Sequence, residues 1–262
     1  MVFFKHEIRM ARKALLIWSS IVGGMILVMM LMFPSMKEEM GKIAESYANL
    51  GPFAEAFGLS KLQMGTAMGF YGIEAGAMLS LGGAMFAAIT ATAMLSKEEG
   101  GHTTEFIYVT PKSRNYFLTQ KLLAVATTIF LFDLICFLIS IISFGIIGEE
   151  IQWNKLSLYF LAQTIMHLQI ASICYGISAF LRKVNVGLGI GIAMLLYFIS
   201  MIANITEGMQ NLRYITPFYY SDAATIFDTL QIPTAHLCTG ILIAALGITS
   251  AYMKYKKKDL NI

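Results

Sequence analysis

The sequence is short of charged residues, which occupy 13% of its 262 positions, where a soluble domain carries about 25%. Apolar residues make up 57% instead, and mean hydropathy is +0.67 over the whole chain. This composition excludes a soluble globular domain. The 18 Phe and 12 Tyr exclude a disordered chain, because such chains are poor in apolar and aromatic residues.

The sequence also has few cysteines and lacks the familiar catalytic motifs. The three cysteines, Cys136, Cys174 and Cys238, lie inside apolar runs, so neither a disulfide framework nor a CxxC site is expected. The chain has no HExxH zinc motif, no GxSxG nucleophile elbow and no GxxxxGK[ST] phosphate loop. We therefore expect no catalytic, metal or cofactor site. The net charge of +3 is too small for nucleic-acid binding.

What the sequence does have is six long apolar runs, each able to cross a bilayer as a helix. They predict an all-α, polytopic fold with a single transmembrane domain over residues 1–262. The expected spans cover residues 14–33, 73–95, 122–148, 157–181, 187–206 and 234–253. The first run lacks an A-x-A-like cleavage site and is expected to be a retained span, not a signal peptide.

Residues 2–13 have a helical pattern of their own. Phe4, Ile8 and Ala11 recur at helical spacing, and basic residues follow one step behind. This pattern predicts a helix lying along the membrane surface, and an ordinary basic flank of the first span is the alternative.

The distribution of Lys and Arg predicts the orientation. Fourteen of the 19 lie in the two termini and in the segments after the second and fourth spans, and five lie on the other side. By the positive-inside rule, both termini are expected to face the cytoplasm.

A few polar residues inside the spans are candidates for function. Asp133 lies near the middle of the third span and Glu74 at the outer end of the second, and either could serve as a pathway or gate residue. For Asp133 a buried hydrogen bond that packs two helices is the alternative. His167 and His236 have the same two interpretations.

Glycines repeat at a spacing of four at the start of the second span. Gly65 and Gly69 form one such pair, and Gly72 and Gly76 form another. This spacing lets helix backbones approach closely, either within the chain or against a second copy.

The segment 96–121 is the most specific feature. Thr103–Val109 is expected to form a short helix with an N-terminal Thr cap, because Glu105 favours its first turn and Pro111 ends it. Phe106 and Ile107 give it an apolar pair. Such a helix suits docking on a soluble partner, and a charged loop is the alternative. We expect no active site at the neighbouring Glu98, Glu99 and His102.

In the segment 96–121, the sequence resembles the membrane subunits of ABC-2-type ABC transporters. Their first cytoplasmic loop has a pattern close to E-x-G-T-x-E-x-L-x-x-x-P-x-S-R and a later lysine, matched in register by Thr103, Glu105, Pro111, Ser113, Arg114 and Lys121. His102 stands at the pattern's glycine, with Gly101 one position early. Further similarity lies in Phe4–Arg9, Tyr214–Phe218 and Lys256–Leu260.

The resemblance implies a six-span half-transporter that pairs with a second copy or a paralogous permease and with two separate ATPase subunits, which carry ATP and Mg²⁺. It implies an elbow helix at 2–13, a coupling helix at 101–110 and an outer hairpin around 207–231. The residues expected to couple to the ATPase are Glu99, Thr103, Glu105, Phe106, Ile107, Pro111 and Arg114. The expected cargo is a peptide, a bacteriocin or an antibiotic-like compound.

Two other classes of protein stay open from the sequence alone. A secondary carrier needs inverted repeats and ion-binding polar groups near the midplane, for which Asp133 gives little support. A membrane-embedded enzyme needs convergent His, Asp or Glu residues from several spans, and the sequence has no such set.

Overall fold

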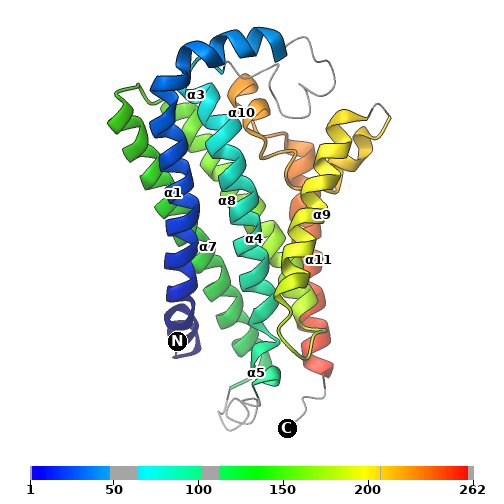
Figure 1. Ribbon diagram of the computed structural model, residues 1–262. Helices are drawn as coiled ribbons and strands as arrows, with labels where there is room; N and C mark the ends of the chain where they lie inside the picture. The colour runs from blue at the N-terminus through cyan, green and yellow to red at the C-terminus, as the bar shows by residue number, and fades with distance from the viewer. Residues whose placement is uncertain (1, 48–63, 102–111, 207, 259–262) are drawn as a thin grey trace.

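The computed structural model describes residues 2–47, 64–101, 112–206 and 208–258, and this part of the chain is helical with no strands. Six long helices stand side by side, and short helices close the two ends of the bundle (Figure 1). In chain order, the elements are α1 (Val2–Tyr47), α3 (Ala67–Phe70), the π-helical turn η1 (Tyr71–Ala75), α4 (Gly76–Met94), α5 (Lys97–Gly100), α7 (Arg114–Ile147), α8 (Trp153–Ser178), α9 (Val186–Ile205), the 3₁₀ turn η2 (Gln210–Tyr214), α10 (Ala223–Thr229) and α11 (Thr234–Lys257).

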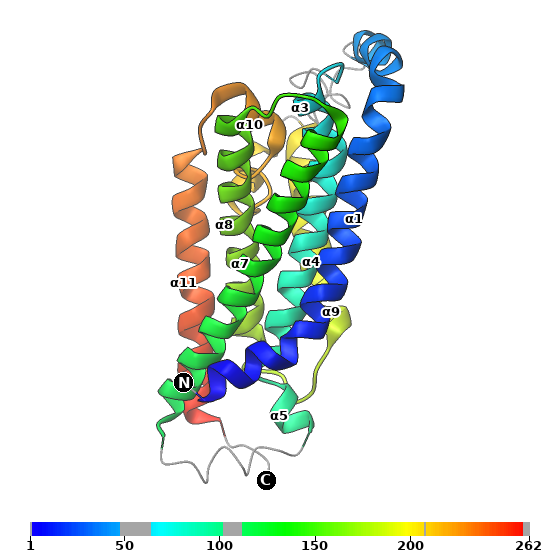
Figure 2. The ribbon, with the colours of Figure 1, turned by 90° about the vertical axis from the view of Figure 1, so that its left-hand side faces the viewer.

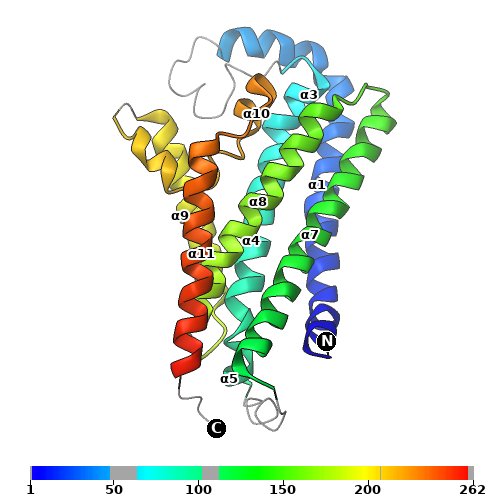
Figure 3. The same ribbon diagram turned by 180° about the vertical axis from the view of Figure 1, so that it is seen from behind.

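Six of these helical stretches are long and apolar enough to cross a membrane. The predicted all-α, six-span fold class is therefore confirmed. α3, η1 and α4 run on without a break as one stretch, Ala67–Met94. The start of α1 and the end of α11 lie at the same end of the bundle, called the basal end below (Figures 1 and 3).

The first helix is longer than the sequence pattern indicated. α1 is one continuous helix of 46 residues that includes residues 2–13, so the predicted elbow is the bent first part of the first span and not a separate helix. These turns run at a steep angle to the rest of α1 (Figure 2). Phe4 and Ile8 are half-buried, whereas Lys5 and Arg9 are exposed.

The part of α1 that is far from the basal end bends as well. Pro34 lies inside the helix, and a proline there removes a backbone hydrogen bond and kinks the helix. Beyond it, the remaining turns run across the top of the bundle (Figure 1).

Local sequence explains where several helices begin and end. The Ser113 hydroxyl accepts a hydrogen bond from the Tyr116 N–H at 3.3 Å and caps the start of α7. Asn185 caps α9 in the same way. At the other end of α7, Gly148 adopts a left-handed conformation with φ of 72°, which L side chains disfavour and glycine does not.

α4 is the central helix of the bundle and packs against α1, α7, α8 and α9. Large apolar side chains of the outer helices point away from it and are exposed, as expected of surfaces that face lipid. On α7 this face consists of Leu123, Phe130, Leu134, Leu138, Ile142 and Ile146.

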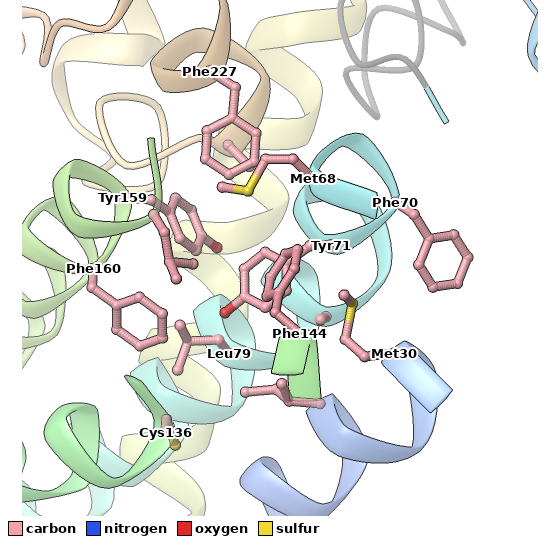
Figure 4. Close-up of a cluster of buried hydrophobic side chains, with 14 of the residues drawn as sticks. Met30, Met68, Phe70, Tyr71, Leu79, Cys136, Phe144, Tyr159, Phe160 and Phe227 are labelled. Atoms are coloured by element: carbon pink, nitrogen blue, oxygen red, sulfur yellow. The ribbon is translucent and has the colours of Figure 1, made fainter. Parts of the chain in front are cut away.

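The half of the bundle opposite the termini contains an aromatic core. The Tyr71 ring lies 5.6 Å from that of Phe144 and 6.3 Å from that of Tyr159, measured between centroids, and Phe227 of α10 packs on Tyr159 at 5.5 Å (Figure 4). The Tyr159 hydroxyl donates to the carbonyl of Gly76 at 2.8 Å. This core holds α10 and the first turns of α8 against η1 and α4.

Candidate functional site

Buried and half-buried charged residues gather at the basal end. The group consists of Glu7, Lys97, Glu98, Glu99, Lys121 and Lys258 and is called the basal network below. Lys121 is fully buried and forms ion pairs with Glu98 and with Glu7, the latter at 3.1 Å from Nζ to Oε1. Lys97 also pairs with Glu7. The first turns of α1 are thereby joined to α5 and α7.

Burying these charges is favourable only if each is paired and hydrogen-bonded. Lys121 Nζ meets this condition, because it also donates to the carbonyl of Met94 at 2.6 Å. The ammonium group lies 4.9 Å from the centroid of the Phe117 ring as well. The network therefore holds the Lys121 side chain of α7 in one position against the end of α4.

A second set of contacts ties down the end of α11. Lys258 Nζ pairs with Glu99 at 2.7 Å and donates to the carbonyl of Leu181, also at 2.7 Å. Arg114 Nη1 donates to the carbonyl oxygens of Tyr255, Lys256 and Lys258 at 3.0–3.2 Å. Since the last carbonyls of a helix have no partner within the helix, Arg114 acts as a C-terminal cap for α11.

Of the residues predicted to couple to an ATPase, the structure describes two, Glu99 and Arg114. Both lie at the basal end and contact the last turn of α11 or the residue after it. The others, namely Thr103, Glu105, Phe106, Ile107 and Pro111, lie outside the described residues, as does the predicted coupling helix beyond Gly101. Lys121, which the family pattern also matched, lies at the centre of the basal network.

The mid-span acid Asp133 has a partner in the next long helix. Its Oδ1 lies 2.9 Å from His167 Nδ1 on α8, and both side chains are buried. His167 Nε2 faces the carbonyl of Ser80 on α4 at 3.4 Å. The pair thus connects three helices, as expected of a buried hydrogen bond that packs helices together. A role of Asp133 in the pathway or gate stays a prediction.

Glu74 lies in η1 at the end of the bundle opposite the termini and is half-buried. His236, the other histidine considered, stacks on Tyr214 with centroids 4.2 Å apart. Among the described residues, no group of three or more His, Cys, Asp or Glu side chains is placed to hold a metal ion.

The predicted glycine pairs lie at the start of the second span, at the end of the bundle opposite the termini. Gly69 and Gly72 are buried and Gly65 is half-buried. At Gly76 a Cβ would meet the Tyr159 hydroxyl at 2.8 Å, so this glycine makes room for α8 of the same chain. Further along α4, Gly83 makes room for the His167 ring. A role for the four predicted glycines in dimer contacts stays a prediction.

Sequence reasoning missed the basal network as a unit. One signal was present, because Glu7 is the only acidic residue among the first thirteen, and a lone acid in a basic flank is a candidate for an ion pair. The pairing of Glu7 with Lys121 depends on how α1 lies against α7, which the local sequence does not encode.

The fold and this site define a multi-pass helical membrane protein. The family model for ABC-2 family transporter protein matches residues 1–260, and the chain belongs to this family. Family membership implies association with an ABC ATPase, and the membrane subunits of this family are generally non-catalytic. No curated protein matches the chain.

Proposed function

We propose that this chain is the permease subunit of an ATP-driven exporter in a bacterial plasma membrane, with both termini in the cytoplasm. Two copies, or one copy and a paralogous permease, would form the membrane part. Two separate ATPase subunits would bind ATP and Mg²⁺, since the chain itself has no phosphate-loop motif. A peptide, a bacteriocin or an antibiotic-like compound is the proposed cargo.

The observation that carries this proposal is the basal network, whose residues lie on both sides of the segment 102–111 in the sequence. Glu98 and Glu99 precede this segment, and Arg114 and Lys121 follow it. Lys121 contacts Glu7 of α1 and Met94 of α4, and Arg114 contacts the end of α11. A force applied to the segment by a partner would therefore reach several spans at once. Two arrangements of these spans, biased by the ATPase, are what alternating access requires.

The decisive experiment replaces Phe106, the apolar residue proposed to anchor the partner. Truncating a buried interface anchor costs about 2 kcal/mol or more, whereas removing a charge at the rim costs much less. Phe106→Ala should therefore release the ATPase, or uncouple ATP hydrolysis from transport, and the control Lys112→Ala should not. The readouts are co-purification of the ATPase and cargo-stimulated hydrolysis.

Two results would overturn the proposal. If the chain transports cargo with no ATPase bound, it is a secondary carrier. If Phe106→Asp still binds the ATPase and transports normally, the docking surface lies elsewhere in the chain.

A further inference from the structure

A cluster of basic and aromatic side chains lies at the end of the bundle opposite the basal end, where η2 contacts the first turns of α11 (Figure 3). It consists of Arg213, Tyr214, Tyr219 and His236 and is called the basic aromatic cluster below. The Thr239 hydroxyl of α11 donates to the carbonyl of Tyr214 at 3.3 Å and holds η2 against this helix. The cluster therefore has a fixed place beside the start of a long apolar helix.

The Tyr219 ring brings the two basic side chains together. The guanidinium carbon of Arg213 lies 4.9 Å from the centroid of this ring, and the centroid of the His236 ring lies 4.6 Å from it. His236 also stacks on Tyr214, with centroids 4.2 Å apart. A guanidinium group that rests on an aromatic ring keeps its N–H donors free for a ligand. A ligand beside Tyr219 can therefore meet both basic side chains.

The protein itself does not satisfy these two side chains. Within the part of the chain that the structure describes, the side chains of Arg213 and His236 form neither an ion pair nor a hydrogen bond, and Arg213 Nε and His236 Nδ1 are buried without a partner. Both side chains are half-buried as a whole. The nitrogens that a ligand can reach are therefore the other ones, Nη1 and Nη2 of Arg213 and Nε2 of His236.

The chemistry of these nitrogens suits a phosphate group. A guanidinium group is always charged and donates two parallel hydrogen bonds to two oxygens of one phosphate. An imidazole N–H can donate to a further oxygen, and a phosphate group has oxygens to spare for it. Arg213 thus supplies the charge and the fork, and His236 supplies an additional donor.

The position of the cluster favours a lipid as the source of the phosphate. α11 is the least buried of the six long apolar stretches that the structure describes, and its Ile241 and Leu242, one to two turns beyond His236, are exposed. His236 lies in the first turn of this helix, at the level where a spanning helix leaves the headgroups and where tyrosines are common. A lipid can place its phosphate on the cluster and its acyl chains along α11.

We propose that Arg213 and His236 bind a phosphate group at the membrane surface, and that an anionic lipid headgroup supplies it. A general attraction of anions does not account for such binding, because this end of the bundle also exposes the carboxylates of Glu38, Glu39 and Glu150. Saturable binding would therefore report on the cluster itself. The proposal is independent of the exporter function, since lipid binding can be measured on the purified chain without an ATPase.

The test uses dioctanoyl phosphatidylglycerol as the probe and thermal unfolding of the full chain in a neutral detergent as the readout. A ligand that binds only the folded state raises Tm in a saturable manner. The phospholipid should do so, and dioctanoylglycerol, which has the same acyl chains without the phosphate, should not. Sodium phosphate, compared with sodium chloride at equal ionic strength, identifies the source. A weak shift or none supports the lipid, and binding as tight as that of the phospholipid would overturn the lipid as the source.

Arg213→Gln is the most informative variant, because glutamine keeps a planar polar group and loses the charge. It should weaken the apparent Kd for phosphatidylglycerol about tenfold or more, the effect of losing a charge-assisted hydrogen bond. Arg213→Lys keeps the charge without the fork and should weaken binding less. His236→Phe keeps a ring beside Tyr214 and Tyr219 but has no N–H donor, so it should also weaken binding, and it tests the site independently if Arg213→Gln fails to fold.

Lys155→Gln is the matched control, since Lys155 is a half-buried cation near the start of α8, at the same end of the bundle and outside the cluster. It should bind phosphatidylglycerol like the unaltered chain. The proposal is wrong if phosphatidylglycerol gives no saturable shift, if dioctanoylglycerol gives the same shift, or if Lys155→Gln weakens binding as much as Arg213→Gln. ATPase co-purification is unaffected by these outcomes, so the exporter function is judged separately.

Discussion

Lys121 shows how a single buried charge can organise one end of a membrane protein. Its side chain has no exposed surface, and it lies between two carboxylates, a backbone carbonyl and an aromatic ring. The carboxylates come from α1 and from α5, which are far apart in the chain. Removing the cation would take one ion-pair partner from each of the carboxylates of Glu98 and Glu7, which lie in a largely buried environment.

We therefore expect Lys121→Met to lower the free energy of unfolding by about 3–5 kcal/mol, the usual cost of breaking a buried ion pair on one side. Lys5→Met, at an exposed position on α1, should change it by no more than about 0.5 kcal/mol. Thermal unfolding in detergent measures both. Equal stability of the two variants would mean that the basal network does not hold α1, α5 and α7 together.

Asp133 and His167 likewise form a buried contact between helices, near the middle of the third and fourth spans. A carboxyl group there is tolerated only with a polar partner, and His167 provides one at 2.9 Å. The sequence identified both residues as candidates, because each interrupts an apolar run. It did not reveal that they face each other, since that depends on the rotation of α7 relative to α8.

Among the elements, α8 and α11 approach each other closely at Gly176 and Gly247. A Cβ on Gly247 would meet the Ser172 carbonyl oxygen at 2.6 Å, and one on Gly176 would meet the backbone of Gly247. Backbone atoms cannot rotate away as a side chain can. The contact between these two helices therefore depends on the absence of side chains there.

Gly247→Ala should push α11 away from α8 and lower the free energy of unfolding by about 1–3 kcal/mol, the usual cost of overpacking. Gly191→Ala is the matched control, because Gly191 also lies within a spanning helix but its Cβ would have nothing within 4 Å. It should be neutral or stabilising, by up to about 1 kcal/mol. If both variants unfold at the same temperature, the close approach of α8 and α11 is not needed for stability.

Hydrophobic periodicity and the positions of Gly and Pro predict the helices well, but they predict the contacts between helices poorly. Each of the six apolar runs corresponds to one long helix, and Gly148 marks the end of α7 because glycine tolerates its backbone conformation. The continuation of α1 past Pro34 was missed, since a proline signals a break but can instead give a bend. The basal network was missed because it is built from several helices at once.

At the scale of the whole molecule, labelling can test which end of the bundle faces the cytoplasm. The excess of Lys and Arg predicts that the basal end is cytoplasmic. Lys112 lies at that end and Glu39 at the other, and both are exposed. They offer two sites for labelling.

In a background with Cys238→Ser, a cysteine at position 39 should react with a membrane-impermeant maleimide in intact cells. A cysteine at position 112 should react only after lysis. The reverse pattern would place the basal end outside and remove the proposed docking site from the reach of any ATP-hydrolysing partner.

The pairing of α1 with α7 has a mechanical consequence. The two helices pack along each other, and they are linked at both ends, by Glu7 with Lys121 at the base and by Lys37 with Glu149 at the top. The part of α1 between the bent first turns and Pro34 spans about 20 residues and rises about 30 Å, which matches the hydrocarbon thickness of a bilayer, about 30 Å. If the base of α7 tilts, α1 would tilt with it, because ion pairs join the two helices at both ends. The segment of α1 beyond Pro34 would then move across the top of the bundle by a larger distance than the base.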